Sequence, residues 1–122
     1  MIPSGPNEHL FAVAFGPAVI SGYGPEPQVI LVSFSSIKPG LPYDNTCEVM
    51  PGEHPFISKG SYIYYREPRI CAMSLVQQRV ATNYWRPQQA CSTDLIQKIV
   101  NGFRRSRRLP GYVNEILDQV GY

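Results

Sequence analysis

A nearly continuous apolar segment, QVILVSFSS at residues 28–36, limits the folds that this chain can adopt. Its apolar side chains barely alternate with polar ones, and Pro27 and Pro39-Gly40 stand on either side of it. A strand that is buried on both faces has this pattern, whereas a strand with one solvated face alternates. The segment therefore predicts a central strand in a sheet that is covered on both sides.

Three further segments favour strands: LFAVAF at residues 10–15, TCEVM at 46–50 and SYIYYREPRIC at 61–71. Turns separate them, because the 122 residues include twelve prolines and ten glycines. Pro68 lies inside the last segment. Since proline cannot donate to a strand ladder, Pro68 predicts an edge, a bend or a bulge there.

The pattern becomes helical after residue 73. Residues 74–81 predict one or two helical turns. Residues 92–108 carry apolar side chains at positions that form a single helical stripe, with Ser92 or Thr93 as the cap. A final short helix is expected to end near residue 120, since its apolar residues share one face.

The order of these elements sets the fold class. Strands occupy residues 10–71 and helices residues 74–120, with no alternation of strand and helix. The sheet should therefore be antiparallel or mixed, in one α+β domain that spans residues 1–122.

Charge is uneven along the chain, although the net charge is only +2. Residues 1–60 carry two lysines against five acidic residues, a balance of −3, and residues 61–122 carry nine basic residues against four acidic ones, a balance of +5. A basic half suits a polyanionic partner, or it forms a solvated basic face.

The three cysteines, Cys47, Cys71 and Cys91, are widely spaced and form no CxxC or Cys/His zinc pattern. They are typical of reduced thiols, so we expect a cytoplasmic protein without a metal or other cofactor. No apolar run approaches the ~20 residues that span a bilayer, and no basic-then-apolar leader opens the sequence. We therefore expect no membrane partner.

Four segments follow one another in an order found in a known family. An apolar strand, HLFAVAF, comes first, and VILVSFSS then ends in Ser35-Ser36, where the family has a Thr-Ser pair. KGSYIYYREPRICAMSLVQQ stands in the place of a later strand and short leucine-containing turn, and STDLIQKIVNGF in that of a final amphipathic helix. Over most of residues 5–105 the chain thus resembles the MazF/PemK toxin endoribonucleases.

The resemblance implies an SH3-like antiparallel barrel of about five strands followed by two to three helices, in a homodimer. It also implies the toxin of a toxin–antitoxin system, which cleaves single-stranded RNA without metal and binds a short acidic antitoxin. The chain departs from the family at two places. Asn7-Glu8-His9 replaces an arginine ahead of the first strand, and Ser35 replaces the threonine. A fold inference tolerates such changes better than an activity inference does.

Metal-free RNA cleavage needs a base, an acid and cationic donors for the phosphorane. Histidine suits the first two roles, and His9 and His54 both fall beside strand ends. We expect one of them to act as acid or base, with Ser35 donating a hydrogen bond to phosphate and Arg69 binding it. The alternative is that both histidines are surface turn residues.

Arg66 and Arg69 lie three residues apart on an extended segment, so alternation sends them to opposite faces unless a bulge intervenes. We expect one of them to face the site, with an ion pair to a neighbouring glutamate as the alternative. Tyr62 and Tyr64 share a face. Tyr64 is the candidate for stacking on a base, although strand tyrosines also pack in cores and interfaces.

Further RNA contacts are expected from Ser36, Lys59, Arg104 and Arg105. A hydroxyl at a strand end can bind phosphate, or it can satisfy a turn backbone. Arginines in the last turn of a helix can bind phosphates, or they can complement the helix dipole.

Two functions remain open from the sequence. The first is the toxin endoribonuclease that the resemblance implies. The second is a non-catalytic nucleic-acid- or protein-binding module on the same barrel, which would use Tyr84, Trp85 and the arginines at the helix end. The missing family arginine favours the second function.

Overall fold

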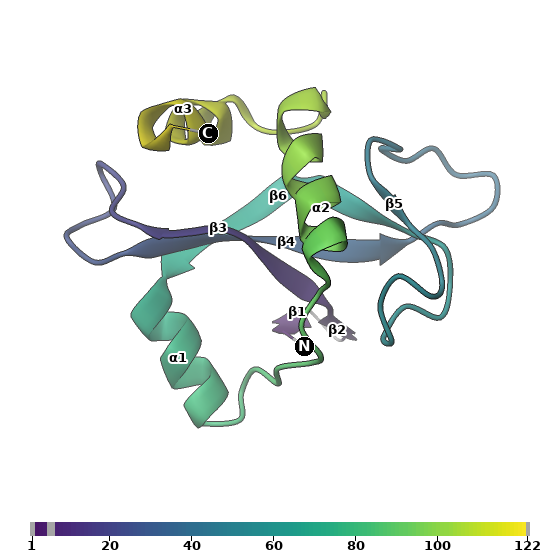
Figure 1. Ribbon diagram of the computed structural model, residues 1–122, viewed down its shortest axis with the longest axis horizontal. Helices are drawn as coiled ribbons and strands as arrows, with labels where there is room; N and C mark the ends of the chain where they lie inside the picture. The colour runs from purple at the N-terminus through teal and green to yellow at the C-terminus, as the bar shows by residue number, and fades with distance from the viewer. Residues whose placement is uncertain (1, 5–6, 122) are drawn as a thin grey trace.

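A computed structural model describes residues 2–4 and 7–121 of the chain. Four antiparallel strands form the main sheet in the order β3-β4-β6-β5 (Figure 1). Their bounds are Phe11–Ala18 for β3, Gln28–Ser36 for β4, Ser61–Ala72 for β6 and Glu48–Val49 for β5. The predicted α+β class and the antiparallel sheet are confirmed.

The structure does not form the predicted SH3-like barrel of about five strands, because the sheet is open and has four strands. Among the described residues, β3 pairs only with β4 and β5 pairs only with β6, so the two edge strands do not meet. β5 is only two residues long, and Pro51 and Gly52 follow it almost at once. Such a short edge strand offers too few backbone groups to continue the sheet toward β3.

Strand β4 lies between β3 and β6, as its apolar pattern predicts. All seven residues from Gln28 to Phe34 are buried, and exposure begins only at Ser35 and Ser36. The polar end of the strand therefore projects beyond the core, and it marks one end of the sheet.

A bulge interrupts β6 where the sequence places Pro68. Leu31 of β4 pairs with Arg69 and Ser33 pairs with Tyr64, so residues 65–68 of β6 stand opposite the single residue Val32. The expectation of an irregularity at this proline is confirmed.

Three helices follow the sheet: α1 (Met73–Ala81), α2 (Thr93–Arg105) and α3 (Gly111–Val120). Helix α2 crosses the sheet, α3 lies beside its C-terminal end, and α1 lies apart from both (Figure 1). The backbone N–H of Leu95 donates to the Ser92 hydroxyl at 3.1 Å, which confirms Ser92 as the cap.

The core lies between the sheet and helices α2 and α3. The ring of Phe103 on α2 packs edge-on against Phe15 of β3 and Tyr65 of β6, with centroid distances of 4.7 and 5.0 Å. These contacts fix α2 across the strands, since aromatic pairs in this geometry stabilise beyond their buried area.

Residues 2–4 and 7–9 form two paired strands that the sequence did not predict. Strands β1 (Ile2–Ser4) and β2 (Asn7–His9) pair antiparallel as a separate sheet. His9 ends β2 and leads almost directly into β3, which brings its ring to the same end of the main sheet as Ser35.

Candidate functional site

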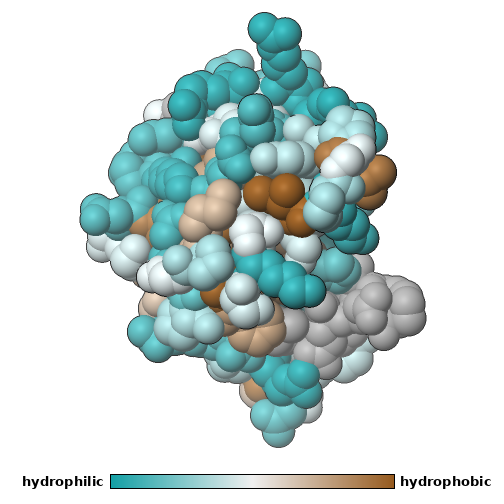
Figure 2. Space-filling view, turned by 90° about the vertical axis from the view of Figure 1, so that its right-hand side faces the viewer, coloured by the Kyte–Doolittle hydropathy of each residue, from teal (hydrophilic) through white to brown (hydrophobic). Residues whose placement is uncertain are grey.

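A hollow of about 570 Å³ lies at the end of the sheet where β4 finishes and β6 begins. The connections at residues 37–47 and 50–60 provide most of its walls. We call it the lysine hollow, because Lys38 and Lys59 line it together with His9. Figure 2 faces this end of the molecule and shows hydrophobic side chains in the middle of a mostly hydrophilic surface.

Aromatic rings and hydroxyl groups complete the lysine hollow. The rings belong to Tyr43, Phe56 and Tyr62, of which Phe56 is 44% exposed. Ser35 and Ser36 contribute hydroxyls from the end of β4. Cations, stacking surfaces and hydrogen-bond donors thus meet in one concave site, which is the chemistry that binds nucleotides.

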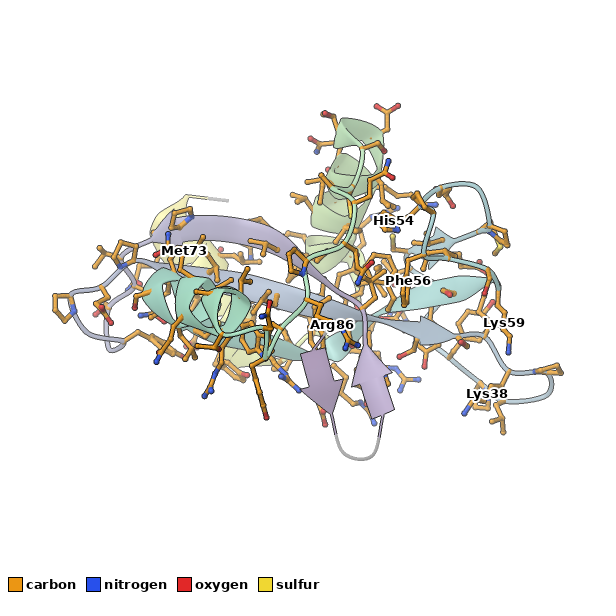
Figure 3. All side chains as sticks on the ribbon, turned by 90° about the horizontal axis from the view of Figure 1, so that it is seen from below. Lys38, His54, Phe56, Lys59, Met73 and Arg86 are labelled. Carbon is orange, nitrogen blue, oxygen red and sulfur yellow. The ribbon has the colours of Figure 1, made fainter. Side chains whose placement is uncertain are left out.

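The lysines come from two different loops. Lys38 follows β4 and Lys59 precedes β6, and Figure 3 shows both at this end of the sheet. Both side chains are exposed, and the described residues provide neither of them with a salt bridge. Two unpaired ammonium groups favour an anionic ligand in the space that they line.

His54 does not line the lysine hollow, because its ring turns inward. The ring is 4% exposed, and the backbone N–H of Phe56 donates to its Nδ1 at 3.0 Å. Nε2 therefore carries the proton and donates to the Gln89 carbonyl oxygen at 2.6 Å. His54 ties the 50–60 loop to the segment between α1 and α2, and both ring nitrogens are used.

A second, smaller hollow of about 140 Å³ adjoins the first. Arg66 from the β6 bulge and Arg108 from the connection between α2 and α3 line it, with Tyr64 beside them. We call it the arginine hollow. Tyr43 and Tyr62 line both hollows, so the two lie next to each other.

Asp44 fixes the loop that borders both hollows. Its Oδ1 accepts hydrogen bonds from the Thr46 backbone N–H at 3.0 Å and from the Thr46 hydroxyl at 2.5 Å, and its Oδ2 accepts one from the Ser106 hydroxyl at 2.5 Å. Burial raises the pKa of Asp44, but these hydrogen bonds and the Arg108 charge outweigh burial and hold it below the usual 3.8.

Lys98 on α2 anchors the other loop. Its Nζ donates to the Glu48 carbonyl oxygen of β5 and to Glu53 Oε1, the latter at 3.0 Å. Glu53 Oε2 also accepts from the Met50 backbone N–H at 2.6 Å. Burial raises the pKa of Glu53, but the contacts with Met50 and Lys98 lower it by more, so the net pKa lies below the usual 4.5. The carboxylate therefore stays charged at neutral pH.

Three predicted arginines lie outside both hollows. The Arg69 guanidinium stacks over the Phe11 ring, with 4.6 Å from its central carbon to the ring centroid. Arg104 binds α3 through Asn114 Oδ1 at 3.0 Å and Asp118 Oδ1 at 2.7 Å. Arg105 donates to the carbonyl oxygen of its own helix at Asn101, at 3.3 Å. Arg104 thus holds two helices together.

The structure brings together six predicted residues at the two hollows. His9, Ser35, Ser36 and Lys59 line the lysine hollow, and Tyr64 and Arg66 line the adjoining arginine hollow. Sequence reasoning missed Lys38 and Tyr43, and it considered Arg108 only as one of the arginines at the helix end. A lysine next to Pro39-Gly40, directly after the central strand, was the available signal for Lys38, since loops at strand ends collect functional groups.

The described part of the chain holds no group of three or more histidine, cysteine or acidic side chains arranged for a metal ion. None of the helices in that part has the length and apolar character to cross a bilayer. Comparisons with protein-family models, with curated proteins and with solved structures found no match to this chain.

Proposed function

We propose that this protein binds single-stranded RNA in the lysine hollow. One observation carries the proposal: Lys38, Lys59 and His9 share a concave site with the rings of Tyr43 and Tyr62. Lysines neutralise phosphates, and each neutralised phosphate adds to a salt-dependent affinity. Tyr43 and Tyr62 are partly exposed, and stacking of a base on an aromatic ring is worth ~1–3 kcal/mol.

The aromatic lining favours a single strand over a duplex. A paired base is already stacked, so it cannot lie on a protein ring without leaving its helix. The hydroxyls of Ser35 and Ser36 add donors and acceptors that suit a ribose 2′-hydroxyl and a phosphate oxygen. A single-stranded RNA uses all of these groups together.

Metal-independent cleavage of the bound RNA is the second candidate function, and it rests on His9. In the described structure His9 is the histidine that lines the lysine hollow, since His54 is turned away. Its ring would take the proton from the 2′-hydroxyl as that oxygen bonds to phosphorus, and Lys38 and Lys59 would stabilise the charged phosphorane. The P–O5′ bond then breaks to leave a 2′,3′-cyclic phosphate, and a lysine ammonium or water would protonate the leaving 5′-oxygen. A toxin of this kind would form a homodimer and be blocked by a short acidic antitoxin that binds the same lysines.

Fluorescence anisotropy with a labelled single-stranded RNA tests the binding proposal. We expect binding that weakens steeply with salt, a much weaker response to duplex RNA, and a strong loss in a Lys38→Ala/Lys59→Ala variant. Arg79→Ala is the matched control, because this cation lies on α1 over the Tyr84 ring. Equal binding by wild type and the double lysine variant would refute the proposal.

Incubation of the same RNA with the protein in EDTA separates cleavage from binding. If cleavage occurs, His9→Ala should abolish it while keeping most of the affinity. Intact RNA in the presence of a tightly binding wild-type protein would reject the endoribonuclease and leave the binding function in place.

A further inference from the structure

We infer that the arginine hollow is a second phosphate-binding subsite, so that one RNA strand spans both hollows across the ring of Tyr62. This inference rests on the proposed function and extends it to a minimum ligand of more than one nucleotide. The residues that carry it are Arg66, Arg108, Tyr43 and Tyr62.

The first argument is that the two hollows adjoin. Pro42, Tyr43 and Tyr62 line the lysine hollow and the arginine hollow alike, so the two hollows share one wall. Lys38 and Lys59 lie in the first and Arg66 and Arg108 in the second. A ligand that passes along the shared wall therefore meets cations on both sides of the tyrosines.

The second argument is the row of rings between the cations. The centroids of Tyr43 and Tyr62 are 5.1 Å apart with an interplanar angle of 37°, and those of Tyr62 and Tyr64 are 6.5 Å apart with an angle of 68°. The Tyr43 hydroxyl donates to Glu48 Oε2 at 2.9 Å, which holds its ring in place. Fixed rings bind bases with little loss of side-chain entropy.

The third argument is the charge balance of the arginine hollow. Asp44 also lines it, but three hydrogen bonds from Thr46 and Ser106 already occupy this carboxylate. Two guanidinium groups thus face one internally bonded carboxylate, which leaves net positive charge. Arg66 is exposed, and no salt bridge to it is formed by the residues that the structure describes. A guanidinium can bind a phosphate through two parallel hydrogen bonds.

Asp44 also positions the subsite. Its bond to Ser106 ties the loop after β4 to the connection between α2 and α3, and the Arg108 backbone N–H donates to the same Ser106 hydroxyl at 3.1 Å. Arg108 is therefore held beside the loop that carries Tyr43. The bond thus brings together two segments that lie 62 positions apart in the chain, beside the arginine hollow.

The subsite model makes a quantitative distinction between ligands. A mononucleotide has one phosphate and can satisfy only one hollow. A longer single strand can satisfy both hollows. Log affinity falls as log salt rises, and each phosphate contact makes this negative slope steeper by ~0.7. Loss of the phosphate contact in the arginine hollow should therefore make this slope shallower by ~0.7 for a long strand, and it should leave a mononucleotide in the lysine hollow unaffected.

The experiment measures salt-dependent affinity for a single-stranded RNA of ten uridines and for uridine monophosphate. The Arg66→Ala/Arg108→Ala variant should bind the decamer more weakly than wild type, and its affinity should depend less steeply on salt. It should bind the mononucleotide as wild type does. Arg79→Ala/Arg107→Ala, which removes the same charge from outside both hollows, should keep the wild-type slope.

The outcomes separate this inference from the proposed function. A wild-type slope for the decamer in Arg66→Ala/Arg108→Ala, together with a loss of binding in Lys38→Ala/Lys59→Ala, overturns the second subsite alone. An equal loss for the control variant also overturns it, since bulk charge would then explain the effect. If the wild-type protein binds neither the decamer nor uridine monophosphate, both proposals are overturned.

Discussion

The hydroxyl of Tyr65 on β6 donates a hydrogen bond to the Ile99 carbonyl oxygen on α2, at 2.7 Å. The tyrosine is fully buried, and burial raises the pKa of its hydroxyl, so the group stays protonated as a donor. The contact requires Gly102 one helical turn further on, because a Cβ at that position would lie 2.0 Å from the Tyr65 oxygen and 2.7 Å from its ring. The bond therefore sets how closely α2 approaches the sheet.

Gly102→Ala should destabilise the protein. The added methyl group cannot fit unless the Tyr65 ring or α2 moves, and overpacking of this kind costs ~1–3 kcal/mol. Thermal unfolding followed by circular dichroism should show a clear fall in Tm. Gly111→Ala is the control, since nothing lies within 4 Å of a Cβ there and alanine favours the helix. A Tm for Gly102→Ala at or above that of Gly111→Ala would contradict the packing described for α2.

Asp44 should make the fold sensitive to acid. Its folded-state pKa is lowered below 3.8, so it contributes stability that is fully present above the unfolded pKa and is lost as pH falls through the folded one. Asp44→Asn should therefore be less stable than wild type at pH 7, and it should lose less stability between pH 5 and pH 3. Denaturant unfolding at several pH values measures both differences.

Glu115→Gln is the matched control for Asp44→Asn, because Glu115 is an exposed carboxylate on α3. It should keep the wild-type pH dependence. If Asp44→Asn follows the wild-type curve over the whole range, the hydrogen bonds from Ser106 and Thr46 do not stabilise the carboxylate as described.

His54→Ala should loosen the loop that carries Phe56 and Lys59. The substitution removes the partner of the Phe56 N–H and of the Gln89 carbonyl oxygen, and each lost hydrogen bond costs ~0.5–1.5 kcal/mol. Hydrogen exchange should accelerate at Phe56, and RNA affinity should fall because Lys59 is less well placed. His9→Ala is the comparison, since its effect should appear in cleavage or binding without faster exchange in this loop.

The sheet strands were predictable because local pattern determines them. The observed bounds of β4 equal the predicted ones, since the apolar run begins right after Pro27 and gives way to serines and to Pro39-Gly40 at its other end. The open sheet was not predictable, because closure depends on the length of β5, and the sequence cannot show that only Glu48 and Val49 pair.

The site was predictable only in part, for a related reason. Ser35, Ser36 and Lys59 lie at strand ends, and strand ends follow from sequence pattern. The inward turn of His54 depends on Gln89, which is 35 residues away, and the place of Arg108 depends on the bond between Asp44 and Ser106. Neither contact leaves a signal in a single sequence.

Tyr62 should contribute most of the stacking, because it lies between the two hollows and contacts both neighbouring rings. Tyr62→Leu puts a smaller apolar side chain in place of the aromatic face, so RNA affinity should fall by ~1–3 kcal/mol, about 5- to 150-fold. Tyr112→Leu is the control, since this tyrosine is 50% exposed on α3 and lines neither hollow. Because stacking is not electrostatic, the salt slope should stay unchanged in Tyr62→Leu while the affinity falls at every salt concentration. Equal RNA affinities for the two variants would show that the ring of Tyr62 carries no base, and the strand would then have to follow a path away from the shared wall.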